Sequence, residues 1–134
     1  MYQPTERIQE LLNACEQIIS HMEVSDSHQV LFEKIKQQLI NSRQQFQFET
    51  HDSHTFMQLQ LTMYELSSHL EKLQESVLND YQVYTNDSID DYEALSYKEQ
   101  IDAPSIYHAK IDYYSTTKLL SNLDKINSEL KQII

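Results

Sequence analysis

The stretch from Phe56 to Val77 carries an unbroken hydrophobic repeat. Its apolar side chains recur at alternating intervals of three and four residues: Phe56, Leu59, Met63, Leu66, Leu70, Leu73 and Val77. This spacing keeps every member on one side of an α-helix, and such a stripe is stable only when it packs against partner helices. The repeat predicts a long helix over about 54–84.

A second repeat of the same kind lies near the C-terminus. Its members are Leu119, Leu123, Ile126, Leu130 and Ile133. Upstream, Ile106, Tyr107, Ile111 and Tyr114 continue an apolar pattern as far back as Pro104. Proline suits the first turn of a helix because its missing N–H would be unpaired there. A fourth long helix is therefore expected over about 104–134.

Two shorter amphipathic stripes precede the long repeats. One predicts a helix over about 4–22 and contains Ile8, Leu11, Leu12, Cys15, Ile18, Ile19 and Met22. The other predicts a helix over about 27–48 and contains Leu31, Ile35, Leu39 and Phe46, supplemented by Phe32 and Phe48. On the third helix, the apolar face is expected to be widened by Met57, Leu61, Tyr64 and Leu78. That width favours packing against more than one neighbour, as in a helical bundle.

Short polar segments separate these helices. Asp26 and Gln29 have the spacing of a capping box, and Asp52 or Ser53 can cap the third helix. Cys15 lies within the first apolar stripe and is expected to be a small buried hydrophobe rather than a reactive thiol.

The complete absence of glycine restricts the fold class further. The 134 residues include no Gly and only 2 Pro. Tight hairpin turns, phosphate-binding loops and dinucleotide fingerprints all need glycine for positive φ or close backbone approach. We therefore predict a single all-α domain, 1–134, folded as an antiparallel four-helix bundle with long third and fourth helices. The 85–103 connection has room for a short extra helix, at about 88–101.

The expected helix lengths are unequal, and this directs attention to one end of the bundle. The third helix starts beside the end of the second, so its surplus length falls at its far end. The end of the third helix and the start of the fourth should project past the other two by a few turns.

Acidic residues are concentrated near that same end. The formal net charge is -11, and residues 80–103 contribute 7 acidic and 1 basic side chain, a net -6. A net-acidic surface repels phosphate, which disfavours direct binding to nucleic acid or to an anionic membrane.

Seven of the nine tyrosines fall within residues 81–114. Tyrosine is enriched at binding hot spots because it offers a large contact area at low entropic cost. The candidate partner-binding residues are Tyr81, Tyr84, Asp87, Asp90, Asp91, Tyr92, Glu93, Tyr97, Tyr107, Tyr113 and Tyr114. The alternative is that these rings plug the end of the bundle.

Metal sites and catalytic motifs are not recognisable in the sequence. His51 and His54 flank Asp52, but the remaining ligands of a zinc site would have to be remote. Glu65 and His69 lack the spacing of a di-iron bundle, and the acidic cluster at 87–93 lacks the glycine of a calcium loop. No nucleophile–base arrangement stands out either, so we expect no enzymatic activity, no metal and no cofactor.

These observations favour a non-catalytic protein-binding module, similar in architecture and charge to small secretion chaperones or adaptors. Its partner would be another protein, such as a basic or amphipathic helical segment. Two alternatives remain: an acidic inhibitor, immunity or DNA-mimic protein that blocks a basic site on an enzyme, and a structural homodimer. The N-terminus has no signal-peptide pattern and the chain has no long apolar run, so a soluble cytoplasmic protein is expected.

Overall fold

The computed structural model describes residues 3–24, 26–48, 51–85 and 104–133, without the side chains of 80–85 and 104–111. These residues form α1 (Pro4–Ser20), a 3₁₀ turn η1 (Asp26–His28), α2 (Gln29–Phe48), α3 (Ser53–Thr85) and α5 (Pro104–Ile133). The all-α prediction is confirmed for this part of the chain, which contains no strand. The short helix expected at 88–101 lies outside the described residues.

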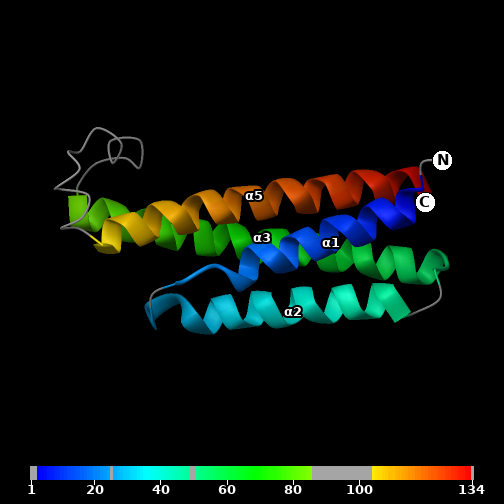
Figure 1. Cartoon of the computed structure of the whole chain (residues 1–134), viewed down its shortest axis with the longest axis horizontal. Helices are drawn as coiled ribbons and strands as arrows, with labels where there is room; N and C mark the ends of the chain where they lie inside the picture. Colours follow the sequence, from blue (N-terminus) through cyan, green and yellow to red (C-terminus); the bar gives the residue numbers. More distant parts are fainter. Residues whose placement is uncertain (1–2, 25, 49–50, 86–103, 134) are drawn as a thin grey trace.

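The four helices lie side by side, and each packs against two others. α3 contacts α2 and α5, and α1 contacts α2 and α5. Consecutive helices run in opposite directions in Figure 1, and the start of α1 and the end of α5 lie at the same end of the molecule. α1 and α3 are therefore diagonal to one another.

The core confirms the repeat on α3. All seven residues of that repeat are buried, and Met63 and Leu73 are fully inaccessible. The predicted widening of the face is wrong, because Met57, Leu61 and Tyr64 are 53%, 68% and 50% exposed. Each of these three residues follows a buried one by one or two positions, which turns it toward the outer side of the helix. Leu78 alone among the widening residues packs partly against the core.

α2 contributes a similarly narrow stripe. Phe32, Ile35, Leu39 and Phe46 are buried, with Ser42 continuing the same spacing. Phe48, expected to supplement this face, is instead 80% exposed at the last residue of the helix. The predicted capping box is also wrong in detail. Residues 26–28 form a 3₁₀ turn, and Gln29 Nε2 donates a hydrogen bond to the Val24 carbonyl.

The turn between α2 and α3 uses its polar side chains as caps. Asp52 Oδ1 accepts hydrogen bonds from the backbone N–H and the hydroxyl of Thr55, at 2.9 and 3.0 Å, which confirms the predicted N-cap. These bonds from Thr55 lower the pKa of Asp52. His51 Nε2 donates to the Phe46 carbonyl at 2.6 Å and stacks on the Phe46 ring. His51 therefore satisfies a carbonyl at the end of α2.

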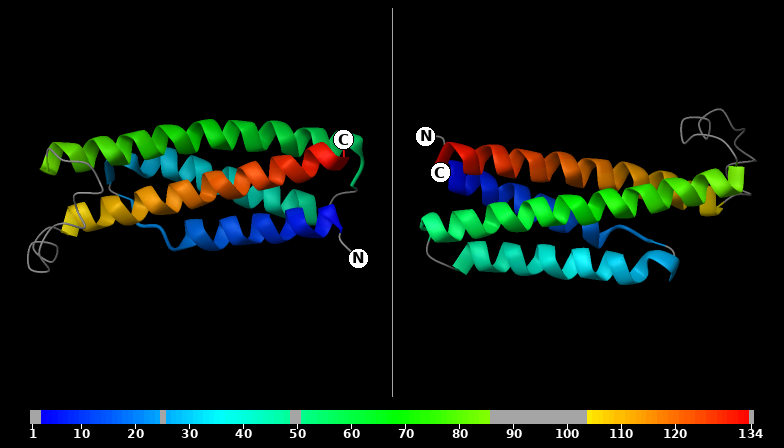
Figure 2. Two further views of the ribbon diagram at one scale, coloured as in Figure 1. Left: turned by 90° about the horizontal axis from the view of Figure 1, so that it is seen from above. Right: turned by 180° about the vertical axis from the view of Figure 1, so that it is seen from behind.

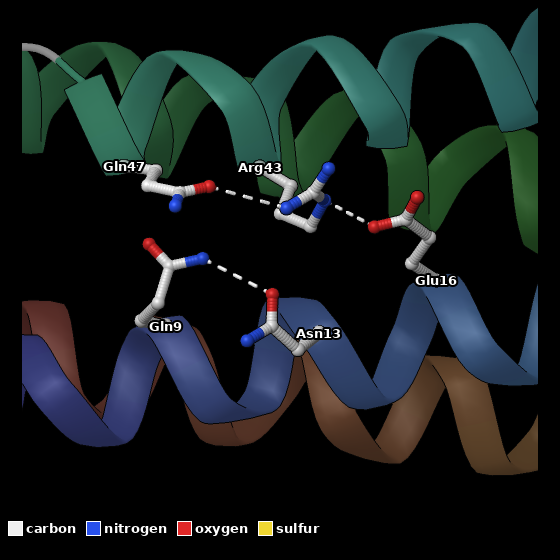
Figure 3. A network of polar contacts seen from close by, with 5 residues as sticks. All are labelled: Gln9, Asn13, Glu16, Arg43 and Gln47. Carbon is white, nitrogen blue, oxygen red and sulfur yellow. Dashed lines mark hydrogen bonds and ion pairs between the residues drawn. The ribbon is translucent and has the colours of Figure 1, made fainter.

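A polar contact joins α1 to α2 on the outside of the bundle. Figure 3 shows Arg43 of α2 between Glu16 of α1, with which it forms an ion pair, and Gln47. Nearby on α1, Gln9 Nε2 donates to Asn13 Oδ1 at 3.2 Å. Both charged side chains keep partial solvent contact, so this ion pair contributes at most about 1 kcal/mol.

α5 is the most polar contributor to the interior. Leu119, Leu123, Ile126 and Leu130 are buried as predicted, and Ile133 packs partly against them. Buried polar residues interrupt this apolar face: Asp112, Thr116, Asn122 and Asn127. The Asn122 side chain hydrogen-bonds to Cys15 of α1. Burial raises the pKa of the Cys15 thiol to about 11, an effect that the Asn122 bond partly offsets, so Cys15 is an unreactive core residue as predicted.

Candidate protein-binding surface at the projecting end

The side-chain contacts between helices define where α1 and α2 stop. Cys15 of α1 contacts Asn122 of antiparallel α5, so Ser20, five residues further along α1, is level with Thr117. The Phe46 and Phe56 rings lie 6.4 Å apart between α2 and α3, so Gln29, 17 residues before Phe46, is level with residue 73. α1 therefore ends level with Thr117, whereas the η1 turn before α2 reaches further toward the same end of the bundle (Figures 1 and 2).

Beyond Thr117 α3 and α5 continue without α1, and their ends also reach past η1. α3 extends 11 residues from Gln74 to Thr85, and α5 begins 12 residues before Thr116. At about 1.5 Å per residue, the projecting pair is roughly 17 Å long. Figures 1 and 2 show the same two helix ends reaching past the rest of the molecule. We call this pair of helix ends, residues 75–85 and 104–115, the overhang.

A hydrogen-bond cluster joins α3 to α5 at the base of the overhang. Gln74 Nε2 donates to Thr117 Oγ1 at 2.7 Å and to Thr116 Oγ1 at 3.1 Å, with the Tyr113 carbonyl at 3.4 Å. Both threonine hydroxyls in turn donate to that same carbonyl. Because the Thr116 side chain is buried, these bonds fix the register of the two long helices near the level where α1 ends.

Removing this cluster should have a measurable cost. We expect Gln74→Ala to lower the free energy of unfolding by about 1 kcal/mol, since two threonine hydroxyls lose a donor from the opposite helix. The matched control is Gln60→Ala, two heptads earlier on the same face of α3. Urea unfolding followed by circular dichroism measures both variants. An equal loss in the two would contradict a specific role for the Gln74 cluster.

Asp112 is the feature of the overhang that sequence reasoning missed. It lies near the base of the overhang, is only 4% exposed, and its Oδ1 atom has no hydrogen-bond partner among the described residues. Burial raises its pKa to about 7; the charge of His28 opposes this rise, and the charge of Glu23 adds to it. A signal for this residue existed, because continuing the C-terminal repeat backwards from Leu119 in steps of three and four reaches Thr116 and then Asp112.

The structure describes only two of the predicted binding side chains. Tyr113 is partly buried against the core, whereas Tyr114 is 45% exposed on the outer side of α5. Their rings meet edge to face at 5.8 Å. Tyr81, Tyr84 and Tyr107 lie on the overhang helices, but their side chains are not described. Asp87, Asp90, Asp91, Tyr92, Glu93 and Tyr97 lie outside the described residues, so their role stays a prediction.

Neither a metal-binding cluster nor a membrane-spanning helix occurs among the described residues. This part of the chain contains no group of three or more His, Cys, Asp or Glu side chains arranged to hold a metal ion. None of its helices combines the length and apolar character needed to cross a membrane. Comparisons with known protein families, with characterised proteins and with solved structures find no match.

Proposed function

We propose that this chain is a non-catalytic, cytoplasmic protein-binding module that uses the overhang to bind a basic, amphipathic helical segment of another protein. The scaffold would be an antiparallel four-helix bundle whose long third and fourth helices present the site. One observation carries the proposal: α3 and α5 continue for roughly 17 Å past the level at which α1 ends. An added helix can pack lengthwise against this projecting pair, where the half-exposed Tyr114 ring can contribute to the contact.

The charge of the chain supports a basic partner. The segment that connects α3 to α5 lies within residues 80–103, which carry a net charge of -6. Complementary charge speeds association and excludes nucleic acid. A second copy of the chain would bring two such stretches together, which favours a basic segment over a homodimer.

A designed peptide tests this proposal without knowledge of the natural partner. The probe is an amphipathic helix with leucines on one face and lysines and arginines on the other, and calorimetry measures its affinity. We expect Tyr114→Ala to weaken binding by about tenfold, because half-exposed tyrosines are frequent binding hot spots. Tyr64→Ala is the matched control, since Tyr64 is 50% exposed on α3 outside the overhang. The affinity of the Tyr64→Ala variant for the peptide should stay within about twofold of the wild-type affinity.

Two further measurements could contradict the proposal: the dependence of peptide binding on ionic strength, and the binding of an acidic version of the peptide. An apolar contact should retain most of its affinity between about 0.1 M and about 1 M ionic strength, because salt screens only the charged component. Loss of nearly all binding at high salt would instead support a mimic of nucleic acid. Equal binding of a peptide with the same leucines and glutamates in place of the basic residues would overturn the proposed charge preference. Equal effects of Tyr114→Ala and Tyr64→Ala would overturn the proposed location.

A further inference from the structure

The connection between α1 and α2 lies across the base of the overhang. Cys15 contacts Asn122, so Met22, seven residues later, is level with residue 115 on α5. Met22 and Val24 are both buried in the common core, although neither belongs to a helix. Gln29 holds the far side of this connection through its 3.0 Å hydrogen bond to the Val24 carbonyl. We call the described residues 21–24 and 26–28 the strap.

Charged residues of the strap act on a buried carboxyl group, that of Asp112. Asp112 is almost completely buried, and its Oδ1 atom lacks a hydrogen-bond partner among the described residues. Two charged groups of the strap act on it: Glu23, which repels its ionised form, and His28, which attracts it. On α3, the described titratable group nearest this level is Glu75, which is exposed. The side chains of Asp80, His108 and Lys110 are not described.

We propose that the strap is a proton-controlled cover over the base of the overhang, held closed while Asp112 is protonated and released when Asp112 ionises. A neutral carboxyl is tolerated at this buried position, whereas a carboxylate is disfavoured because its Oδ1 atom is buried without a hydrogen-bond partner among the described residues. Opening of the strap hydrates the carboxylate. It also uncovers the apolar side chains of Met22 and Val24 beside α3 and α5.

The direction of the pH effect follows from the two pKa values. Beneath the closed strap the pKa of Asp112 is about 7, against an ordinary value of 3.8 once the group is hydrated. The closed form binds more protons between these values, so the opening equilibrium increases as pH rises through this window. The equilibrium constant for strap opening should rise by about tenfold from pH 6 to pH 8, and most of this change should occur below about pH 7.5.

Hydrogen–deuterium exchange of the strap amides in the full chain tests the inference. After correction for intrinsic exchange, we expect protection of residues 22–24 to fall by about tenfold from pH 6 to pH 8. Amides of residues 11–19 in α1 report on global unfolding and serve as the internal reference. Asp112→Asn, which is neutral at every pH and similar in shape, should remove the pH dependence. Unchanged pH dependence in Asp112→Asn, or none in the wild type, would overturn the inference.

Two further variants keep the test decisive if Asp112→Asn alters the fold. Glu23→Gln removes a repelling charge and should move the midpoint to lower pH, whereas His28→Gln removes an attracting charge and should move it to higher pH. Shifts of the same sign in both variants would contradict the strap mechanism. This exchange experiment does not use the peptide, so its failure would not contradict the proposed binding function. Failure of the peptide experiment, in turn, would not contradict the strap inference.

Discussion

Truncating Leu73 to alanine should remove much of the stability of the bundle. Leu73 is fully buried in the core, so its loss leaves a cavity that the surrounding side chains can only partly collapse to fill. Leu→Ala substitutions at such positions cost about 3–4 kcal/mol, the sum of a lost transfer energy and a cavity term. Because small domains have a total stability of only ~5–15 kcal/mol, this variant should unfold at a much lower urea concentration.

The same helix supplies a control with identical chemistry. Leu61 is 68% exposed on the outer side of α3, and Leu61→Ala should change the free energy of unfolding by no more than ~0.5 kcal/mol. Urea titrations of both variants, followed by circular dichroism at one pH, measure the difference. Comparable losses in the two variants would show that Leu61 is covered by a partner, such as a second copy of the chain. They would also contradict the narrow core face described above.

Replacing Asp112 by asparagine should stabilise the protein at alkaline pH and leave it unchanged under mildly acidic conditions. The pKa of Asp112 is about 7 in the folded chain and 3.8 as its ordinary value, so the folded state binds the extra proton between these limits. Stability contributed by this group is therefore present below about pH 4, declines as pH rises, and is fully lost above about pH 7. The difference between these two pKa values limits the contribution of Asp112 to the free energy of unfolding to about 4 kcal/mol. Partial hydration should reduce the effect to about 2–3 kcal/mol.

The comparison requires unfolding measurements at two pH values. The advantage of Asp112→Asn over the wild type should be about 2–3 kcal/mol at pH 8 and close to zero at pH 4. Asp124→Asn serves as the control, because Asp124 is an exposed carboxylate on the same helix. An advantage that is independent of pH would mean that the asparagine gains a new hydrogen bond and that the Asp112 charge is not the cause.

The hydrophobic repeats determined which helix faces are buried. Along α3 the spacing of Phe56, Leu59 and the residues after them identified every buried residue whose side chain is described, because helical periodicity is a local property of the sequence. The Asp52 cap was predicted for the same reason, since its partner Thr55 lies only three residues away. Cys15 was likewise assigned to the core from its place in a stripe.

Tertiary structure alone decided how wide those faces are and which polar residues enter them. Tyr64 and Leu61 border the core stripe in the sequence, yet no helix lies over them in the described structure, and they remain exposed. Asp112 occupies a core position because the strap from another part of the chain lies over α5 at that level. Burial of a given residue depends on the neighbours that cover it, and those neighbours are set by contacts between segments far apart in the sequence. For that reason the sequence pointed to the helices and placed Asp112 in register with a core face, whereas the burial of its carboxyl and the role of the strap emerged only from their packing.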